Sequence, residues 1–501
     1  MAHAPLKLHR IGIDTYLEPV IYMRADCPAC RSEGLEVHAR VHVTFEGRSI
    51  IATLNTVGSN ILEENTAGLS EYAWQLLGAR EGGEITIRHA LPVSSFDYVR
   101  GKIYGHEFPD EALQSIIRDI TDGRYTDIFT SAFVTICAGR RMADREIISL
   151  TNAMVDVGDR LEWPQPLIVD KHCVGGLPGN RTTPIVVSIV SAFGLTIPKT
   201  SSRAITSPAG TADTMEVLAP VNLGIDAMRR VVEREGGCVI WGGAMSLSPA
   251  DDILIRVEKA LDLDSEGQMV ASILSKKIAA GSNHVLIDMP IGPTAKIRSA
   301  QMAGVLENYL QETARHVGLE LKIHFSDGRQ PVGNGIGPAL EARDILKVLQ
   351  NAPDAPADLR ERALTLAGKV IEFAPAVGEG EGYALARAIL EDGRAWKKFQ
   401  AICEAQGGMR TIPRAAHRHE ITAAQAGIVS AIDNRRIARV AKLAGAPREK
   451  AAGVDLHVKL DQRVEEGQPL YTIHAEAPGQ LDYALDYLSL GNHVITIGEP
   501  A

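Results

Sequence analysis

One stretch of the chain, residues 170–218, carries the side chains that could do chemistry, gathered in two turns rich in glycine and hydroxyl groups. The first turn contains Lys171, His172, Cys173, Gly175, Gly176, Thr182 and Thr183. Glycines let backbone N–H groups approach an anion, and a helix that begins just after the turn adds its positive end. The first turn therefore has the ingredients of an anion-binding site.

The second turn, residues 201–211, repeats these ingredients and adds a guanidinium group. It contains Ser201, Ser202, Arg203, Ala204, Ile205, Thr206, Ser207, Gly210 and Thr211. An apolar segment at residues 185–197 separates the two turns. One such loop says little, whereas two within about 50 residues, with Lys171 and Arg203, favour an anion site.

Two other chemistries compete for these residues. A P-loop would need the pattern GxxxxGK[ST], which the sequence lacks, and the glycines at 333–337 do not form GxGxxG. Cys173 follows His172 directly, as a thiol nucleophile beside a base could. Side chains of adjacent residues usually point apart and no third partner is evident, so the catalytic-cysteine hypothesis is the weaker one.

The elements that position these turns must be built from a long chain of ordinary composition. With 501 residues, 45% hydrophobic and 23% charged, three or four domains are expected. A net charge of −10 argues against a general nucleic-acid binder but leaves room for a local phosphate site. The six cysteines are sparse, which fits a reducing compartment. With neither an apolar leader nor an apolar run of about 18 residues, a cytoplasmic location without membrane partners is predicted.

Residues 1–90 alternate apolar and polar side chains, which predicts a small β-rich N-terminal domain. Cys27 and Cys30 lie within this region as a CxxC pair. Because a zinc site needs two more ligands and no second pair follows, a structural role is favoured over zinc or redox chemistry, and no metal is predicted.

Residues 91–166 show helical spacing, for example at Leu113, Ile116, Ile117 and Ile120. Residues 167–349 alternate short apolar strands with helical stretches, which predicts an α/β domain with a mostly parallel sheet. Ligands bind such sheets at the carboxyl ends of strands, where the Lys171 turn falls. Residues 350–501 give helices and then short strands, an α+β C-terminal domain. A biotinyl-like hairpin at 458–473 cannot be a carrier, because no lysine follows Lys459.

The two turns together resemble the thymidine and pyrimidine-nucleoside phosphorylase family. That family has a Lys-His-Ser-x-Gly-Gly loop before a Ser-x-Arg-x9-Asp-x2-Glu segment. Here these elements are residues 171–176 and residues 201–216, the second ending in Asp213 and Glu216. The insertion at 178–180 and the segment 204–211 are similar to the longer branch, which includes archaeal AMP phosphorylases and bacterial type 2 thymidine phosphorylases. The resemblance covers nearly the whole chain.

The resemblance implies a multidomain α/β fold in which a helical domain faces a mixed or parallel-sheet α/β domain across a cleft. Residues 250–280 would rejoin the helical domain, and the C-terminal domain would be hammerhead-like. The phosphate ligands implied are Lys171, Cys173, Thr183, Ser201 and Thr211, with Cys173 replacing the usual serine. A thiol is a weaker donor than a hydroxyl, so one hydrogen bond to phosphate is weakened.

The resemblance also implies residues that hold the nucleotide and act on it. The nucleotide-binding set comprises Gly176, the segment Ser202 to Ser207, Thr211, Ser272, Lys276 and Lys296. Asp264 matches the proton donor of the AMP branch, with Asp262 almost as good by sequence, and His172 completes the catalytic pair. An arginine and a tyrosine that grip the base in pyrimidine enzymes read here as Val257 and Leu254. That loss disfavours thymidine.

The sequence therefore predicts a pentosyltransferase that phosphorolyses a nucleoside 5′-monophosphate to free base and ribose 1,5-bisphosphate. Inorganic phosphate would be a co-substrate, and no cofactor is implied. Thymidine phosphorolysis is the alternative substrate reading, and a non-catalytic nucleotide sensor is the alternative of another class. A homodimer or larger homo-oligomer is expected.

Overall fold

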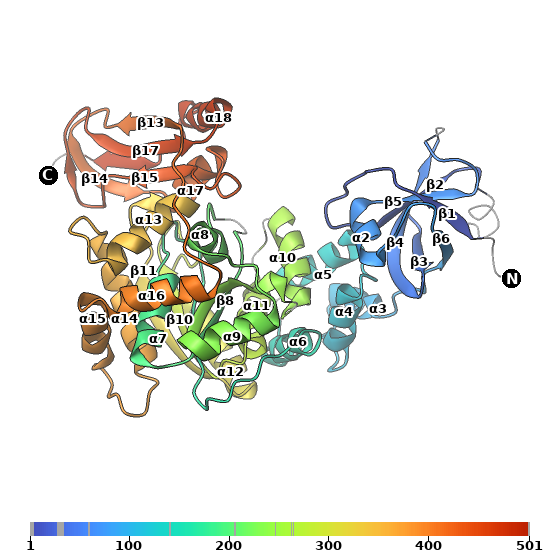
Figure 1. Ribbon diagram of the computed structural model, residues 1–501, viewed down its shortest axis with the longest axis horizontal. Coiled ribbons are helices and arrows are strands. Elements are labelled where there is room, and N and C mark those ends of the chain that lie inside the picture. Colours follow the sequence, from blue (N-terminus) through green and yellow to red (C-terminus); the bar gives the residue numbers. More distant parts are fainter. Residues whose placement is uncertain are drawn as a thin grey trace. The chain divides into compact units, whose positions relative to one another are not determined.

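The computed structural model describes residues 5–27, 35–58, 61–139, 142–204, 207–245, 247–261, 263 and 265–498. The chain folds into two compact units, the first made of residues 1–100 and 118–130, the second of residues 101–117 and 131–501. Strands dominate the first unit, whereas the second combines parallel strands, antiparallel strands and most of the helices (Figure 1). The structure thus has the multidomain α/β architecture that the sequence predicts.

The first unit contains a closed barrel of six strands in the order β1-β5-β2-β4-β3-β6. The strands are β1 (Leu6–His9), β2 (Val20–Arg24), β3 (Arg40–Phe45), β4 (Arg48–Val57), β5 (Thr66–Leu69) and β6 (Glu84–His89), with helix α2 (Glu71–Leu77) after β5. Buried and more exposed residues alternate along β3 and at the start of β6, as strand geometry requires, and Val43 and Ile85 are among the buried ones. Cys27 is buried in the barrel core, and Cys30 lies outside the described residues.

In the second unit, helix α6 (Asp144–Asp156) packs with two helices from a distant stretch of sequence, α10 (Pro249–Leu261) and α11 (Glu266–Ala279). The helices before α6 are α3 (Phe96–Ile103), α4 (Ala112–Thr121) and α5 (Asp127–Gly139), and each of them includes residues of both units. Leu113, Ile116, Ile117 and Ile120 of α4 are all buried, so their helical spacing marks a core face.

A parallel sheet positions the two turns. Strand β7 (Val169–Cys173) pairs with β10 (His284–Ile291), which pairs with β11 (Glu320–Asp327). Strands β8 (Ile197–Ser201) and β9 (Gly237–Trp241) form a parallel pair, joined to β7 through a bridge between Ile168 and Thr196. Because carboxyl ends of parallel strands meet at one edge, the turns after β7 and β8 lie side by side.

The remaining helices of the α/β part pack around this sheet. They are α7 (Thr183–Phe193), α8 (Thr211–Leu218), α9 (Ile225–Glu235), α12 (Ala300–His316), α13 (Pro338–Leu349), α14 (Ala357–Ile371), α15 (Gly382–Glu391) and α16 (Arg394–Ala405). Helix α7 is apolar on all sides and packs against α14, α15 and α16 (Figure 1). Leu364 and Phe399 therefore share one core with Val169, although the sequence analysis begins the C-terminal domain at residue 350. Periodicity reveals an apolar helix face but not which core it enters.

The end of the chain is an α+β region with two antiparallel sheets, ordered β12-β15-β17-β13 and β16-β14-β18. Its strands are β12 (Gly335–Ile336), β13 (His417–Thr422), β14 (Gly427–Ile432), β15 (Gly453–Leu456), β16 (Arg463–Val464), β17 (Pro469–Ala475) and β18 (Ile495–Gly498). Helices α17 (Asn434–Leu443) and α18 (Pro478–Ser489) share a core with these sheets through residues such as Val440 and Ile473.

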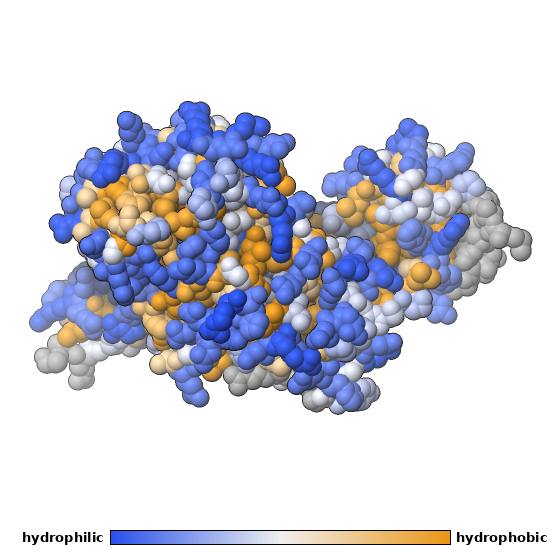
Figure 2. All heavy atoms as spheres, turned by 90° about the horizontal axis from the view of Figure 1, so that it is seen from below, coloured by the Kyte–Doolittle hydropathy of each residue, from blue (hydrophilic) through white to orange (hydrophobic). Residues whose placement is uncertain are grey.

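The face drawn in Figure 2 is covered by hydrophilic residues, with smaller apolar patches among them. Among the described residues, no helix has the length and apolar character needed to cross a lipid bilayer.

Candidate active site

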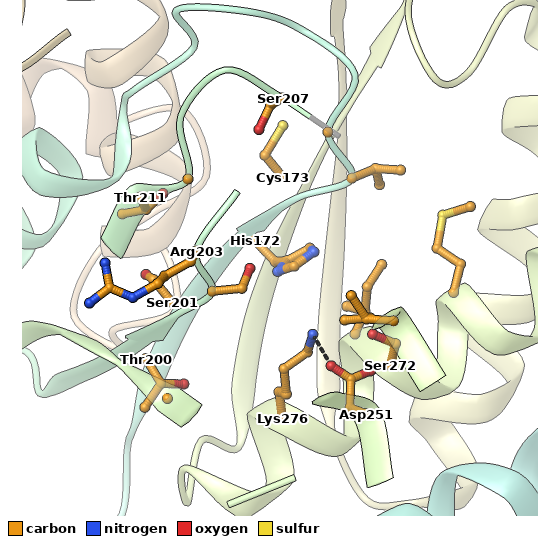
Figure 3. Close-up of a pocket in the computed structure, with 18 of the residues that line it drawn as sticks. His172, Cys173, Thr200, Ser201, Arg203, Ser207, Thr211, Asp251, Ser272 and Lys276 are labelled. Atoms are coloured by element: carbon orange, nitrogen blue, oxygen red, sulfur yellow. Dashed lines mark hydrogen bonds and ion pairs between the residues drawn. The ribbon is translucent and has the colours of Figure 1, made fainter. Parts of the chain in front are cut away.

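A cavity of about 290 Å³ lies within the second unit, where β7 and β8 end. Its walls come from the two turns, from the segment after β9, and from α10 and α11 (Figure 3). The predicted residues that line it are Lys171, His172, Cys173, Gly176, Thr183, Ser201, Ser202, Arg203, Ser207, Thr211, Ser272, Lys276 and Lys296. Ala204 does not line it, and Ile205, Thr206, Asp262 and Asp264 lie outside the described residues.

The end of β7 brings a buried ammonium group to the start of a helix. Lys171 is only 1% exposed, and its Nζ donates a hydrogen bond to Oγ1 of Thr182 at 2.8 Å. Thr182 is the N-cap of α7, so the ammonium faces the positive end of that helix. Two adjacent positive charges favour an anion between them.

Gly176 allows the first turn to touch the segment that carries Lys296. Its φ is 79°, which L side chains rarely adopt, and a Cβ there would lie 2.3 Å from the backbone N of Lys296. A side chain at this position would therefore push the two segments apart. Gly176 thus sets how closely Lys296 approaches the cavity.

Arg181, which is not among the predicted site residues, connects the two turns. Its Nη1 donates to Oγ1 of Thr211 at 2.8 Å, its Nη2 to the carbonyl of Ala209 at 2.7 Å, and its Nε to Glu341 at 2.7 Å. Its place directly before two threonines of the first turn was the available signal.

Arg203 lines the cavity, but its guanidinium is already paired. It binds Glu216 through both nitrogens at 2.8 Å, contacts Asp213 at 3.2 Å, and stacks over the Trp241 ring at 4.8 Å. Figure 3 shows the guanidinium turned away from His172 and Lys276. The geometry therefore indicates that Arg203 holds the second turn in shape.

Beneath the cavity, one carboxylate joins two buried lysines. Asp170 lies 3.1 Å from Nζ of Lys199 and 2.6 Å from Nζ of Lys277, and all three side chains are almost wholly buried. Burial by itself raises the pKa of Asp170, but the two lysines outweigh it and hold that pKa below its usual value. With Lys171 included, this part of the site carries more positive than negative charge.

His172 is a neutral imidazole in this surrounding. Burial lowers its pKa well below the ordinary value, and Lys277, Lys199, Lys276 and Lys171 lower it further, in that order. A neutral imidazole lacks the second ring proton that a general acid would give up at neutral pH, but its one N–H can donate a hydrogen bond and its other nitrogen can accept one.

Cys173 behaves as a thiol rather than a nucleophile. Burial raises its pKa to about 12, with Asp288 adding to the shift. Its Sγ accepts a hydrogen bond from Nδ2 of Asn180 at 3.3 Å. Because the thiolate is the reactive form, the raised pKa argues against the catalytic-cysteine hypothesis.

Some buried polar atoms at the cavity have no hydrogen-bond partner among the described residues. Oγ of Ser201, Oγ of Ser248 and Oδ1 of Asn180 are buried without a hydrogen bond among the described residues. Buried polar groups are nearly always bonded in native proteins, so such atoms at a cavity indicate a polar ligand. Ser201 is one of the residues for which the family resemblance implies a contact with phosphate.

The opposite wall is formed by α10 and α11. Nζ of Lys276 lies 2.7 Å from Oδ2 of Asp251, and Ser272 lies one turn before Lys276 on α11 (Figure 3). Asp252 also lines this wall, and desolvation followed by the charge of Asp251 raises its pKa to about 6.

Leu254 and Val257, which stand where pyrimidine enzymes have polar side chains, do not line the cavity. Both are buried, with 3% and 4% of their surface exposed. Both side chains pack inside the protein around α10, so neither can contact a base in the cavity. Among the described residues, no group of three or more His, Cys, Asp or Glu side chains could hold a metal ion.

Three segments match described protein families. Residues 96–158 match the glycosyl transferase family helical bundle domain, residues 165–396 its a/b domain, and residues 428–494 the pyrimidine nucleoside phosphorylase C-terminal domain. The a/b match extends to residue 396, which agrees with α14 and α15 sharing the core of α7.

Whole proteins show the same likeness. The chain is 60% identical to "Putative thymidine phosphorylase 2" of Acidovorax sp. (strain JS42) over 99% of this chain and 96% of that protein. It is 58% identical to "Putative thymidine phosphorylase" of Legionella pneumophila over the same shares.

Solved structures share the fold at low identity. Anthranilate phosphoribosyltransferase from Thermus thermophilus superposes with a TM-score of 0.51 at 17% identity, covering 62% of this chain and 99% of that one. The Saccharomyces cerevisiae enzyme, solved in complex with PRPP and Mg, gives 0.52 at 14% identity, covering 63% and 98%.

Proposed function

The chain belongs to the thymidine and pyrimidine-nucleoside phosphorylase family, and from this premise we propose that it phosphorolyses nucleoside 5′-monophosphates. Family membership makes it a pentosyltransferase whose substrates are a nucleoside and phosphate. The proposed reaction gives the free base and ribose 1,5-bisphosphate. A non-catalytic sensor finds no support, since its relatives over the full length are named as enzymes.

Phosphorolysis needs phosphate held beneath the anomeric carbon, charge stabilisation for the oxocarbenium-like transition state, and a proton for the base. Phosphate is assigned to Lys171, Thr183, Ser201 and Thr211, with Cys173 beside them. The support is that Lys171 faces the N-cap of α7 while Oγ of Ser201 lacks a partner among the described residues. The surplus of buried lysines around Asp170 adds a field that favours a dianion.

The opposite wall is assigned to the base. Ser272 and Lys276 would hold the base, and the neutral imidazole of His172 would form a hydrogen bond with the substrate. According to the family resemblance, Asp264 would supply the proton to the departing base. No cofactor takes part in this scheme, and phosphate is the second substrate.

A 5′-phosphate is favoured over a bare nucleoside by the second turn and Lys296. Ser202, Ser207 and Lys296 line the same cavity as the phosphate residues, so a nucleotide would meet anion-binding groups at both ends. The buried positions of Leu254 and Val257 remove the side chains that would grip a pyrimidine. Thymidine is the alternative, because the relatives bear that name.

The observation that carries the proposal is the meeting of both turns and the α10–α11 wall at one cavity. A panel of AMP, CMP, UMP, thymidine and uridine, each incubated with purified protein and phosphate, tests it by chromatography of the released base. Nucleotides should give kcat/KM at least tenfold above thymidine. Faster turnover of thymidine would favour the alternative, and no release from any substrate would remove the proposal.

We also propose that the protein forms a homodimer or larger homo-oligomer in the cytoplasm, as the family resemblance implies. Light scattering during size exclusion would show twice the 54.0 kDa chain mass or more. A single 54.0 kDa species would contradict this.

A further inference from the structure

The loop that follows β10, residues 292–297, brings Lys296 to the wall of the cavity. Within this Lys296 loop, the N–H of Gly292 donates to the carbonyl of Ile297 at 3.0 Å, and the N–H of Ala295 donates to the carbonyl of Gly292 at 3.1 Å. Both hydrogen bonds join residues of the loop to each other. They fix its internal shape, whereas its position over the cavity depends on contacts with neighbouring segments.

One of these contacts comes from the C-terminal α+β region. Asn434, the first residue of α17, donates to Oγ1 of Thr294 through its backbone N–H and through Nδ2, each at 3.1 Å. Nδ2 of Asn434 also donates to the carbonyl of Gly328 at 2.9 Å. Gly328 follows β11 directly, and its own N–H donates to the carbonyl of Ile291, the last residue of β10, at 2.9 Å. A single asparagine therefore joins the loop to the end of the sheet.

The donor groups of Asn434 are held rigidly. Its side chain is only 1% exposed, so its hydrogen bonds are shielded from water. The carboxylate of Asp433 caps α17 by accepting the N–H groups of Arg435 and Arg436 at 2.9 and 3.0 Å. Ile437, one turn further along α17, is buried in the core of the C-terminal region. The Lys296 loop is thus anchored to a helix that belongs to a different core.

The C-terminal region also supports the second turn. Nζ of Lys450 lies 2.9 Å from the carboxylate of Glu216, the group that pairs with Arg203. The region therefore contacts the supports of both segments that were assigned to the 5′-phosphate, the second turn and the Lys296 loop. Asn434 makes the more direct of the two contacts, because it binds a side chain of the loop itself.

We propose that Asn434 is a positioning residue that holds the Lys296 loop at the cavity, so that the C-terminal region sets the affinity for the 5′-phosphate of a nucleotide. This inference rests on the nucleotide specificity proposed above. Neither Asn434 nor Thr294 lines the cavity, so both act through Lys296. A hydrogen bond between an ammonium group and a phosphate oxygen is short and depends on geometry. Moving the loop away from the cavity would therefore weaken the hold on the 5′-phosphate and leave the base and ribose contacts in place.

The experiment compares binding of AMP and of adenosine, which differ only in the 5′-phosphate, by isothermal titration calorimetry without inorganic phosphate. The proteins are wild type, Asn434→Ala and Thr294→Val; the second change removes the hydroxyl that accepts both hydrogen bonds and keeps the side-chain size. Each variant should raise Kd for AMP about tenfold or more, as expected when a hydrogen bond to a charged group is lost. Kd for adenosine should stay within about twofold, because adenosine has no group for Lys296 to bind.

Three controls separate positioning of Lys296 from a general loss of structure. Asn492→Ala removes another asparagine side chain of the C-terminal region, whose Nδ2 donates to the carbonyl of Tyr487 at 2.9 Å, and it should keep the wild-type Kd for AMP. Thr294→Ser retains the hydroxyl and should restore tight AMP binding. The double variant Asn434→Ala/Thr294→Val should bind AMP about as weakly as either single variant, because both changes remove the same contact.

An unchanged Kd for AMP in Asn434→Ala and Thr294→Val overturns the inference, as does an equal loss of adenosine affinity or an equal loss in Asn492→Ala. If Asn434→Ala does not fold, Thr294→Val and its serine counterpart decide the question alone. A wild type that binds AMP no more tightly than adenosine overturns the inference together with the proposed nucleotide specificity. A wild type that prefers AMP but releases no base defeats only the proposed reaction, and the Kd values of the variants still decide the role of Asn434.

Discussion

Oδ2 of Asp170 lies 2.6 Å from Nζ of Lys277, in an ion pair from which solvent is almost entirely excluded. The same carboxylate pairs with Lys199 at 3.1 Å. A single buried carboxylate thus contacts two buried lysines, and burial lowers the pKa of one of them, Lys277, to about 7. Breaking a buried pair costs more than breaking an exposed one, because the remaining charge cannot be solvated.

Asp170→Asn should therefore destabilise the protein by about 3–5 kcal/mol, seen as a lower thermal unfolding midpoint. Asp327→Asn is the matched control, since Asp327 pairs with Arg329 at 2.9 Å on the surface. It should cost no more than about 1 kcal/mol. Equal shifts for the two variants would show that the buried cluster does not contribute as described.

Gly176→Ala should weaken nucleotide binding by displacing the segment around Lys296. The added Cβ would meet the backbone N of Lys296 at 2.3 Å. Gly175→Ala is the matched control, because Gly175 also has a positive φ, 100°, but open space around its Cβ. Both changes share the cost of a left-handed backbone, about 1 kcal/mol. KM for the nucleotide should rise at least fivefold more in Gly176→Ala; equal KM values would contradict the contact.

Cys173→Ser should tighten phosphate binding, because a hydroxyl is a stronger donor than a thiol. KM for phosphate should fall about two- to tenfold, in line with one improved hydrogen bond. A rise in KM would mean that the thiol suits the site better than a hydroxyl.

In the wild type, iodoacetamide at pH 7 should label the Cys173 peptide more slowly than glutathione, because the thiol pKa is raised to about 12.

The pairing of Arg203 with Glu216 should make stability depend on acid pH. Arg203, and then Lys450, lower the pKa of Glu216 to about 2 against the desolvation that raises it. A carboxyl whose pKa is lower in the folded state stabilises at pH values above its unfolded pKa and loses that contribution as pH falls toward 2. The gap in unfolding midpoint between wild type and Glu216→Gln should thus be largest near pH 7 and shrink toward pH 3. A gap independent of pH would refute the ion pair.

Much of the site was accessible from the sequence, because the residues that build it lie in two short turns. Lys171, Thr183 and Ser201 could be assigned from glycine and hydroxyl spacing together with the family pattern, and they do meet at one cavity. Ser272 and Lys276 could be placed on one helix face by their four-residue separation. Their roles in binding stay predictions.

Other features depend on three-dimensional neighbours that no local pattern reveals. Arg203 looked like an anion ligand, yet Glu216 and Asp213 take up its guanidinium. Lys199 and Lys277 come from a strand and a helix far apart in the chain, so their convergence on Asp170 has no signal in spacing. The raised pKa of Asp252 depends on desolvation at the cavity wall and on the charge of Asp251, and no spacing in the sequence shows it.

The same limit applies to the fold. Strand alternation and helical spacing located the β-rich start and the core face of α4. The predicted boundary at residue 350 places α14, α15 and α16 in the C-terminal domain, whereas they share a core with α7 of the α/β domain. An apolar helix face alone does not indicate which core it joins.

The most direct test of the central claim, that the paired turns hold inorganic phosphate for attack on a glycosidic carbon, is ³¹P NMR of wild-type protein with AMP and phosphate. The inorganic phosphate signal should decline as a sugar 1-phosphate signal grows in equal amount with free base, and Lys171→Met should abolish the exchange. Base released without consumption of phosphate, or no reaction with any nucleoside or nucleotide of the panel, would contradict the account.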